Sequence, residues 1–116
     1  MDDAGETVIR DTIELTLVPG IGTLTQNRIW KSLPEIGEIF GMGAKAAEAL
    51  GVPGEAYPLI HARAYREIAA EIYEWGSREG CRFLLRGYSG YPALLEEIHD
   101  PPLVLYGRGR TELLEG

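Results

Sequence analysis

The stretch LTLVPGIGTLTQNRIW, residues 15–30, places a Pro-Gly-Ile-Gly turn between two apolar, helix-like runs. A tight turn needs a glycine where the backbone φ is positive, and a second glycine lets another surface approach the backbone closely. We therefore expect a helix-hairpin-helix turn in which Gly20 and Gly22 meet these two separate needs. The stretch predicts a mainly helical fold and raises the question of what approaches the second glycine.

A phosphate group is one candidate for that approaching surface. The free N–H groups at the start of the second helix, with the positive end of the helix dipole, can hold a phosphate oxygen without reading a base sequence. Nearby hydroxyl and cationic side chains would add donors and charge. The candidate DNA-backbone site comprises Gly20, Gly22, Thr23, Thr25, Arg28, Lys31 and Lys45. The alternative is a turn that only packs two helices, because residues 11–27 contain no lysine or arginine.

Helical patterns continue on both sides of this turn as far as residue 75. Thr23, with Gln26 three residues later, has the form of a capping box that opens a helix running through Leu33. Short helices are expected at residues 35–40 and 44–50, each closed by a glycine. The longest periodic segment, LIHARAYREIAAEIYEW, carries apolar residues at helical spacing and predicts one continuous helix over residues 59–75.

The pattern changes after Gly76. CRFLLRG (residues 81–87) and PLVLYGRG (residues 102–109) are short apolar runs bounded by glycine and proline, which is typical of strands. Between them, YPALLEEI predicts a short helix that starts near Pro92. We expect three regions: a flexible acidic N-terminus at residues 1–7, a helical domain at residues 8–75, and a lead-in segment at residues 76–116.

Composition and charge disfavour several classes of protein. The 116 residues include 11 basic and 18 acidic side chains, a net charge of −7 that weakens long-range attraction to phosphate. One cysteine and two histidines offer little for a metal site, and no serine or cysteine is spaced as a nucleophile, so we expect no metal, no cofactor, no catalytic residues and no enzyme activity. The acidic start and the absence of a long apolar run predict a soluble, cytoplasmic protein without a membrane span.

The sequence GYSGYPALLEEIHDPPLVLYGRG, residues 87–109, carries a motif of greater specificity. Its Tyr91-Pro92 pair and Asp100-Pro101-Pro102 element closely resemble the stretch that precedes the Rossmann-like core in the bacterial DNA-processing protein A (DprA/Smf) family. The hairpin at residues 15–30 is similar to the one near that family's N-terminus. The resemblance spans residues 13–109, although the hairpin alone is shared with many DNA-repair proteins.

The resemblance implies a small helix-hairpin-helix or sterile-alpha-motif-like helical domain, followed by a short β-α-β-like lead-in to a Rossmann-like domain. It implies that these residues are an N-terminal fragment, ending before the Gly-Ser/Thr-Arg turn that belongs to the family's main surface for single-stranded DNA. The function expected by resemblance is an accessory module of a protein that binds single-stranded DNA and assists RecA loading in natural transformation. DNA would then be a weak partner or one bound by the full-length protein, and RecA a partner of the full-length protein. The alternative is a protein-interaction or scaffolding module with no direct DNA binding, and the oligomeric state is left open.

Overall fold

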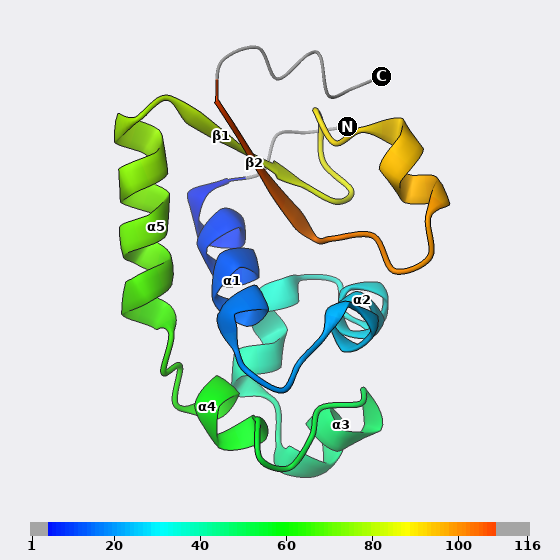
Figure 1. Ribbon diagram of the computed structural model, residues 1–116. Helices are drawn as coiled ribbons and strands as arrows, with labels where there is room; N and C mark the ends of the chain where they lie inside the picture. The colour runs from blue at the N-terminus through cyan, green and yellow to red at the C-terminus, as the bar shows by residue number, and fades with distance from the viewer. Residues whose placement is uncertain (1–4, 109–116) are drawn as a thin grey trace.

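The helix α1 (Glu6–Leu17) is the central element of the computed structural model, which describes residues 5–108 (Figure 1). A mainly helical chain surrounds it, and a two-stranded sheet lies across the N-terminal end of α1 and the C-terminal end of α5 (Figure 1). The elements that follow α1 are α2 (Thr23–Ser32), the 3₁₀ helix η1 (Ile36–Gly41), α3 (Ala44–Ala49), α4 (Tyr57–His61), α5 (Arg66–Arg78), β1 (Cys81–Leu85), the 3₁₀ helix η2 (Ala93–Glu97) and β2 (Val104–Arg108).

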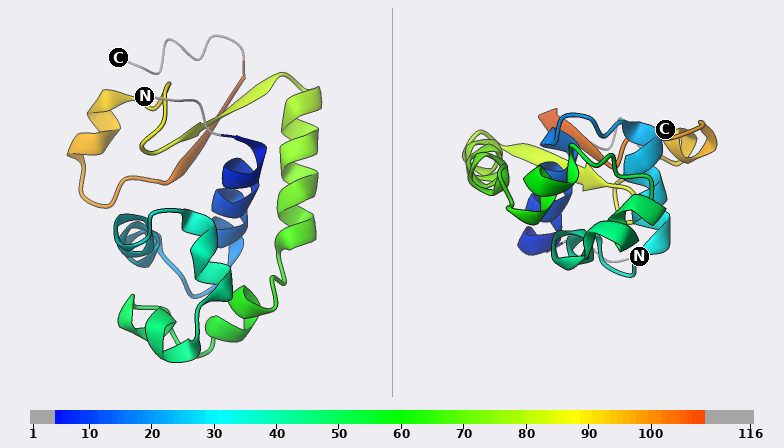
Figure 2. Two further views of the ribbon diagram at one scale, coloured as in Figure 1. Left: turned by 180° about the vertical axis from the view of Figure 1, so that it is seen from behind. Right: turned by 90° about the horizontal axis from the view of Figure 1, so that it is seen from below.

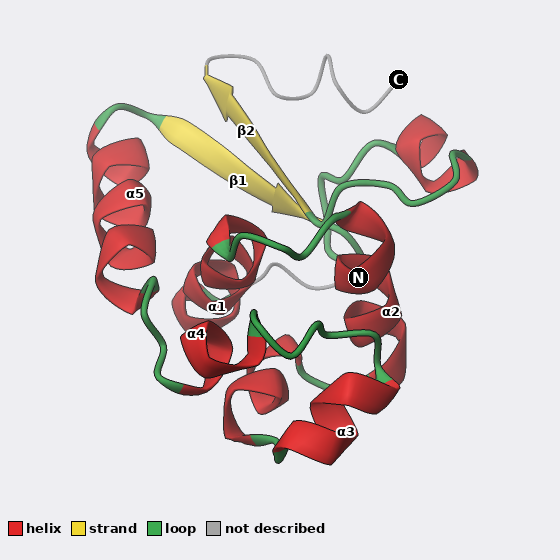
Figure 3. Cartoon of the chain, turned by 60° about the horizontal axis from the view of Figure 1, so that its bottom comes forward, coloured by secondary structure: helices red, strands yellow, loops and turns green. Residues whose placement is uncertain are grey.

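Two hydrophobic clusters hold these elements together. The larger cluster joins the hairpin helices to the short helices on the side opposite the sheet, and its fully buried members include Leu15, Ile29 and Ile39 (Figures 1 and 3). Leu103, which directly precedes β2, belongs to this same cluster. The smaller cluster places Ile13 of α1 against apolar side chains of α5, β1 and β2. The strand segment therefore contributes side chains to both clusters.

The sheet is a pair of antiparallel strands in which Phe83 lies opposite Tyr106 and Leu85 opposite Val104. Seen from behind or from below, it covers one end of the α1–α5 pair (Figure 2). The expected strand, short helix, strand order is present, and the strands and short helices predicted from the sequence are confirmed. The N-terminal region expected to be flexible ran to residue 7, whereas α1 already begins at Glu6. Residues 1–4 and 109–116 of the expected terminal regions lie outside the described residues.

The prediction of one helix over residues 59–75 is wrong, because the chain breaks between α4 and α5. Arg63 adopts a left-handed φ of 54° at this break. Its guanidinium turns back toward α1, where Nη2 lies 2.8 Å from both Asp11 Oδ1 and Glu14 Oε1. It also lies over the Phe40 ring, 4.3 Å from the centroid. The hydrogen bond to Glu14 is the main cause that raises the pKa of Arg63. The Glu14 side chain is only 2% exposed, so it needs this partner, and a continuous helix would not supply it.

The predicted capping box at Thr23 and Gln26 is also wrong. The N-cap of α2 is Gly22, with no side-chain cap, and the buried Gln26 donates instead from Nε2 to the carbonyl of Ile21 at 3.2 Å. A capping box is present at η1, where Glu35 and Glu38 exchange side-chain to backbone hydrogen bonds. Burial of Gln26 against the turn therefore outweighs the local capping pattern.

The Arg63–Glu14 pair generates a test of this long-range constraint. Replacing Arg63 by methionine leaves the buried Glu14 carboxylate without its partner, and we expect the free energy of unfolding to fall by about 3 kcal/mol or more. The double variant Arg63→Met with Glu14→Gln removes both charges and should recover most of that loss. Urea denaturation of the two variants checks this, and an Arg63→Met protein as stable as the parent would contradict it.

Candidate functional site

The hairpin turn between α1 and α2 gives its two glycines different environments. Gly20 has a φ of +91°, a conformation that side chains disfavour, and is exposed. A Cβ at Gly20 would lie 3.7 Å from the Cβ of Ala56, which is ordinary contact. The conformation of the turn, rather than the space around it, therefore requires glycine at position 20.

Gly22 is open where Gly20 is constrained. Its φ of −92° and ψ of −178° are extended values that other residues also adopt. Apart from Gly22 and its two chain neighbours, no heavy atom of residues 5–108 comes within 4 Å of the position a Cβ would occupy. The expected close approach is thus not made by another part of residues 5–108, and this face of the turn is accessible to an external group.

The start of α2 presents backbone donors next to Gly22. The helical hydrogen bonds begin with the N–H of Gln26, which donates to the carbonyl of Gly22 at 3.0 Å. The N–H groups of the preceding first turn therefore have no acceptor inside the helix, and no side chain caps them. Thr23, at the first helical position, is exposed. This end of α2 has the donors and the dipole to hold an anion.

Two of the predicted cations lie on the outer face of α2. Arg28 and Lys31 share this exposed face with Leu24, which is 53% exposed, because the three residues follow helical spacing. Within residues 5–108, neither cation is seen in an ion pair. A Cβ at Gly51 would lie 3.2 Å from Arg28 Nη1 and 3.7 Å from Thr25 Oγ1, so Thr25 and Arg28 meet beside the end of α3.

The seven candidate residues do not form one compact cluster. Lys31 follows Thr23 by eight positions, which is about 12 Å along the helix axis. Lys45 is exposed near the start of α3, and no ion pair or hydrogen bond ties its side chain to the turn within the described chain. The arrangement is an open turn with donors, continued by a basic face along α2.

A buried polar network behind α2 was not anticipated from the sequence. Arg86, which is 8% exposed, donates from Nη1 to Asn27 Oδ1 at 2.6 Å and pairs through Nη2 with Glu96 Oε1 at 3.0 Å. Its guanidinium lies 4.2 Å from the centroid of the Trp30 ring. Asn27 also donates from Nδ2 to the carbonyl of Pro101 at 2.7 Å. An asparagine on the apolar side of a helix was the available signal, because a buried amide needs partners.

A second polar contact fixes the loop that contains η2. The hydroxyl of Tyr91 donates to the carbonyl of Pro102 at 2.5 Å and so joins the two ends of the loop that contains η2. Burial is the main cause that raises the pKa of Tyr91. Tyr91 and the Asp-Pro-Pro element are thus in direct contact through this bond.

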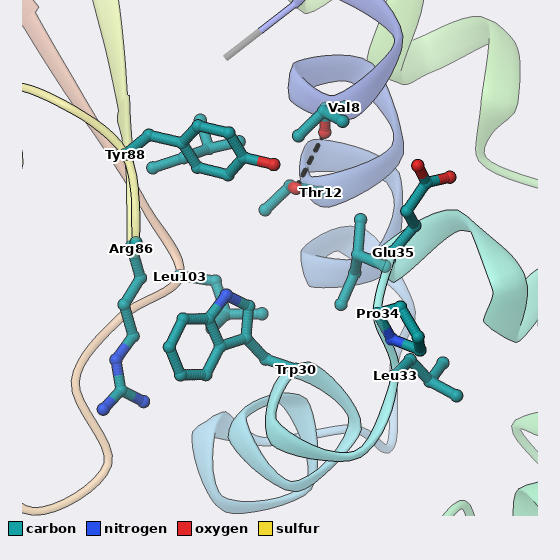
Figure 4. Close-up of a pocket in the computed structure, with 12 residues that line it drawn as sticks. Val8, Thr12, Trp30, Leu33, Pro34, Glu35, Arg86, Tyr88 and Leu103 are labelled. Atoms are coloured by element: carbon teal, nitrogen blue, oxygen red, sulfur yellow. Dashed lines mark hydrogen bonds between the residues drawn. The ribbon is translucent and has the colours of Figure 1, made fainter. Parts of the chain in front are cut away.

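A cavity of about 380 Å³ lies between α1, the end of α2 and β1. Figure 4 shows the rings of Trp30 and Tyr88 at its edge, with Val8 and Thr12 of α1 and Glu35 across from them. None of the seven predicted site residues lines this cavity. It was missed because its walls come from segments far apart in the sequence.

Neither a metal site nor a membrane-spanning helix is seen in residues 5–108. No group of three or more His, Cys, Asp or Glu side chains is placed to hold a metal ion there. None of the helices in residues 5–108 has the length and apolar character needed to cross a bilayer. Comparison of the chain with protein-family models, curated proteins and solved structures gave no match.

The different environments of the two glycines lead to a paired prediction. Gly20→Ala places a side chain at positive φ, so we expect the free energy of unfolding to fall by about 1 kcal/mol or more. Gly22→Asn supplies a preferred N-cap residue in a compatible conformation, so stability should change by only a few tenths of a kcal/mol. Thermal unfolding of both variants checks this, and equal losses of stability would show that the turn does not distinguish its glycines.

Proposed function

We propose that this chain is an accessory module of a DNA-processing protein and that the α1–α2 turn contacts backbone phosphates of single-stranded DNA without reading their sequence. The observation that carries the proposal is the exposed start of α2, whose first-turn N–H groups are uncapped beside the open Gly22. Residues 15–34 contain no acidic side chain, so nothing in this stretch repels a phosphate. The resemblance of residues 87–109 to the DNA-processing protein A family supports the same class of function.

The charge of the chain sets the strength of such binding. Arg28 and Lys31 extend the donor set along α2, whereas the net charge of −7 opposes the approach of DNA. One or two phosphate contacts on a single strand correspond to a slope of log K against log salt of about −1. The module therefore binds DNA weakly. A stronger surface elsewhere in a full-length protein would carry most of the single-strand binding and the assistance to RecA loading.

Gly22 offers a substitution that separates phosphate binding from folding. Gly22→Asp and Gly22→Asn provide equivalent N-caps, and only the aspartate adds a negative charge where the phosphate would sit. At low salt, we expect the parent to bind an oligothymidylate weakly, the Asn variant to bind equally or somewhat less, and the Asp variant not to bind. Fluorescence anisotropy of a labelled oligonucleotide, with circular dichroism as the check on folding, measures this.

A matched pair of arginine variants controls for net charge. Arg28→Gln and Arg78→Gln remove the same charge from two exposed helix positions, one on α2 and the other at the end of α5. Only Arg28→Gln should weaken binding and make the salt dependence shallower, because only Arg28 lies on the proposed face. Equal effects of the two arginine variants, or a Gly22→Asp protein that binds like the parent, would contradict a phosphate site at the turn.

A scaffolding role is the second candidate, and the Arg86 network favours it. This network links α2 to the end of β1 and to the loop before β2, so the helices hold the strand segment in a fixed position. A module of this kind would orient a following domain without touching DNA. Absence of oligonucleotide binding at low salt by the folded parent chain would favour this candidate over the first.

A further inference from the structure

The cavity of about 380 Å³ described above lies in the range typical of small-ligand sites. It sits at the C-terminal part of α2, where Trp30 forms one edge. Trp30 follows Thr23 by seven positions, about 10 Å along the helix axis. The cavity is therefore a separate place from the turn that begins the same helix.

The walls of the cavity combine apolar and polar surface, and the Trp30 wall is closely packed. Val8, Ile36 and Leu85 contribute aliphatic surface. The Trp30 indole is fixed from one side by the Arg86 guanidinium, 4.2 Å from its centroid, and by the backbone at Gly87. A Cβ at Gly87 would lie 3.1 Å from Trp30 Cζ2, so the loop approaches the indole closely and leaves little room for it to move. The indole edge is thus positioned before any ligand arrives.

Polar groups reach this space from both sides. Figure 4 shows the indole nitrogen of Trp30 and the hydroxyl of Tyr88 directed toward the region between the two rings and α1. Among the residues drawn there, one side-chain hydrogen bond is made, from Thr12 Oγ1 to the carbonyl of Val8 at 2.8 Å, and within residues 5–108 no hydrogen bond is seen for the Trp30 indole nitrogen or the Tyr88 hydroxyl. The indole N–H and the tyrosine hydroxyl therefore remain as donors for a ligand, and Thr12 and Tyr88 retain acceptor lone pairs.

These properties select the chemistry of an occupant. An aliphatic side chain would fill the volume but leave the Trp30 N–H and the Tyr88 hydroxyl unpaired once water is displaced, which is unfavourable. An anion would meet the Glu35 carboxylate on the rim, while Arg86 is already paired with Glu96. The cavity thus suits a neutral, flat group with apolar faces and a polar edge, and nucleobases have this character.

We propose that this cavity binds one unstacked nucleobase. The choice of a base rests on the proposed function, in which single-stranded DNA is the partner. The two contacts then differ in their physics: the turn holds phosphate through charge, whereas the cavity holds a neutral base through burial and hydrogen bonds. Binding at the turn falls with salt, and binding in the cavity does not.

Fluorescence of Trp30 reports the cavity directly. The chain has two tryptophans, and replacing the half-exposed Trp75 by phenylalanine leaves Trp30 as the single emitter. Titration of this 116-residue variant with thymidine and with deoxyadenosine, which carry no phosphate, should change the emission saturably. We expect the same affinity at about 50 mM and about 500 mM salt, because no ion pair is involved.

Three variants in this background test the assignment. Tyr88→Phe removes one hydrogen bond and should weaken nucleoside binding by roughly three- to tenfold. Tyr65→Phe is the matched control, since Tyr65 does not line the cavity, and it should leave affinity unchanged. Val8→Phe fills the space with a ring and should abolish nucleoside binding in a protein whose unfolding midpoint is retained.

The results that would contradict base binding in the cavity differ from those that would contradict phosphate binding at the α1–α2 turn. The proposal is wrong if neither nucleoside gives a saturable change up to about 10 mM, or if Val8→Phe binds as the parent does. Tighter binding of N-acetyl-leucinamide than of both nucleosides would assign the cavity to a peptide. If the parent binds nucleosides but Val8→Phe keeps the parent's affinity for oligothymidylate, the ligand of the cavity is a free nucleoside and not DNA. Gly22→Asp leaves the cavity intact, so nucleoside binding should persist in that variant even where oligonucleotide binding is lost.

Discussion

Arg86 carries a charge that is almost fully buried, and the arrangement of the strand segment against the hairpin depends on how that charge is paired. A guanidinium at 8% exposure is tolerated only when its donors are used. Glu96, Asn27 and the Trp30 ring meet this need from the loop after β1 and from α2. The network fixes α2 from behind, so the open turn at one end of the helix and the cavity at its other end share one rigid element.

The two glycines of the turn answer separate physical demands. Gly20 is set by backbone conformation, with φ at +91°, whereas Gly22 is free of contacts and leaves the N-terminus of α2 accessible. An architectural turn and a phosphate site are therefore compatible uses of one hairpin. The exposed face with Arg28 and Lys31 points away from the buried network, so contacts at the turn and along α2 do not disturb the packing that supports them.

Local patterns predicted most of the elements and failed where a distant partner decides the outcome. Periodicity and glycine positions located the hairpin, the short helices and the two strands. The same periodicity suggested one helix over residues 59–75, because nothing local shows that Arg63 must reach Glu14, 49 positions earlier. The hairpin pattern indicated Gly22 and Arg28 as candidate site residues, whereas the open surroundings of Gly22 and the exposure of Arg28 are seen only in the structure. The Arg86–Asn27 bond spans 59 positions, and the cavity that this network borders was equally invisible to spacing.

A double-mutant cycle on Arg86 and Asn27 tests the central claim that this buried contact joins the strand segment to the hairpin. Urea unfolding of Arg86→Met, Asn27→Ala and the double variant gives the interaction free energy, and shared contacts of this kind lie at about 0.5–3 kcal/mol. We predict a favourable coupling of at least about 1 kcal/mol, with helix content and tryptophan fluorescence changing in one transition. Additive effects within about 0.5 kcal/mol, or separate transitions for the two probes, would contradict the account.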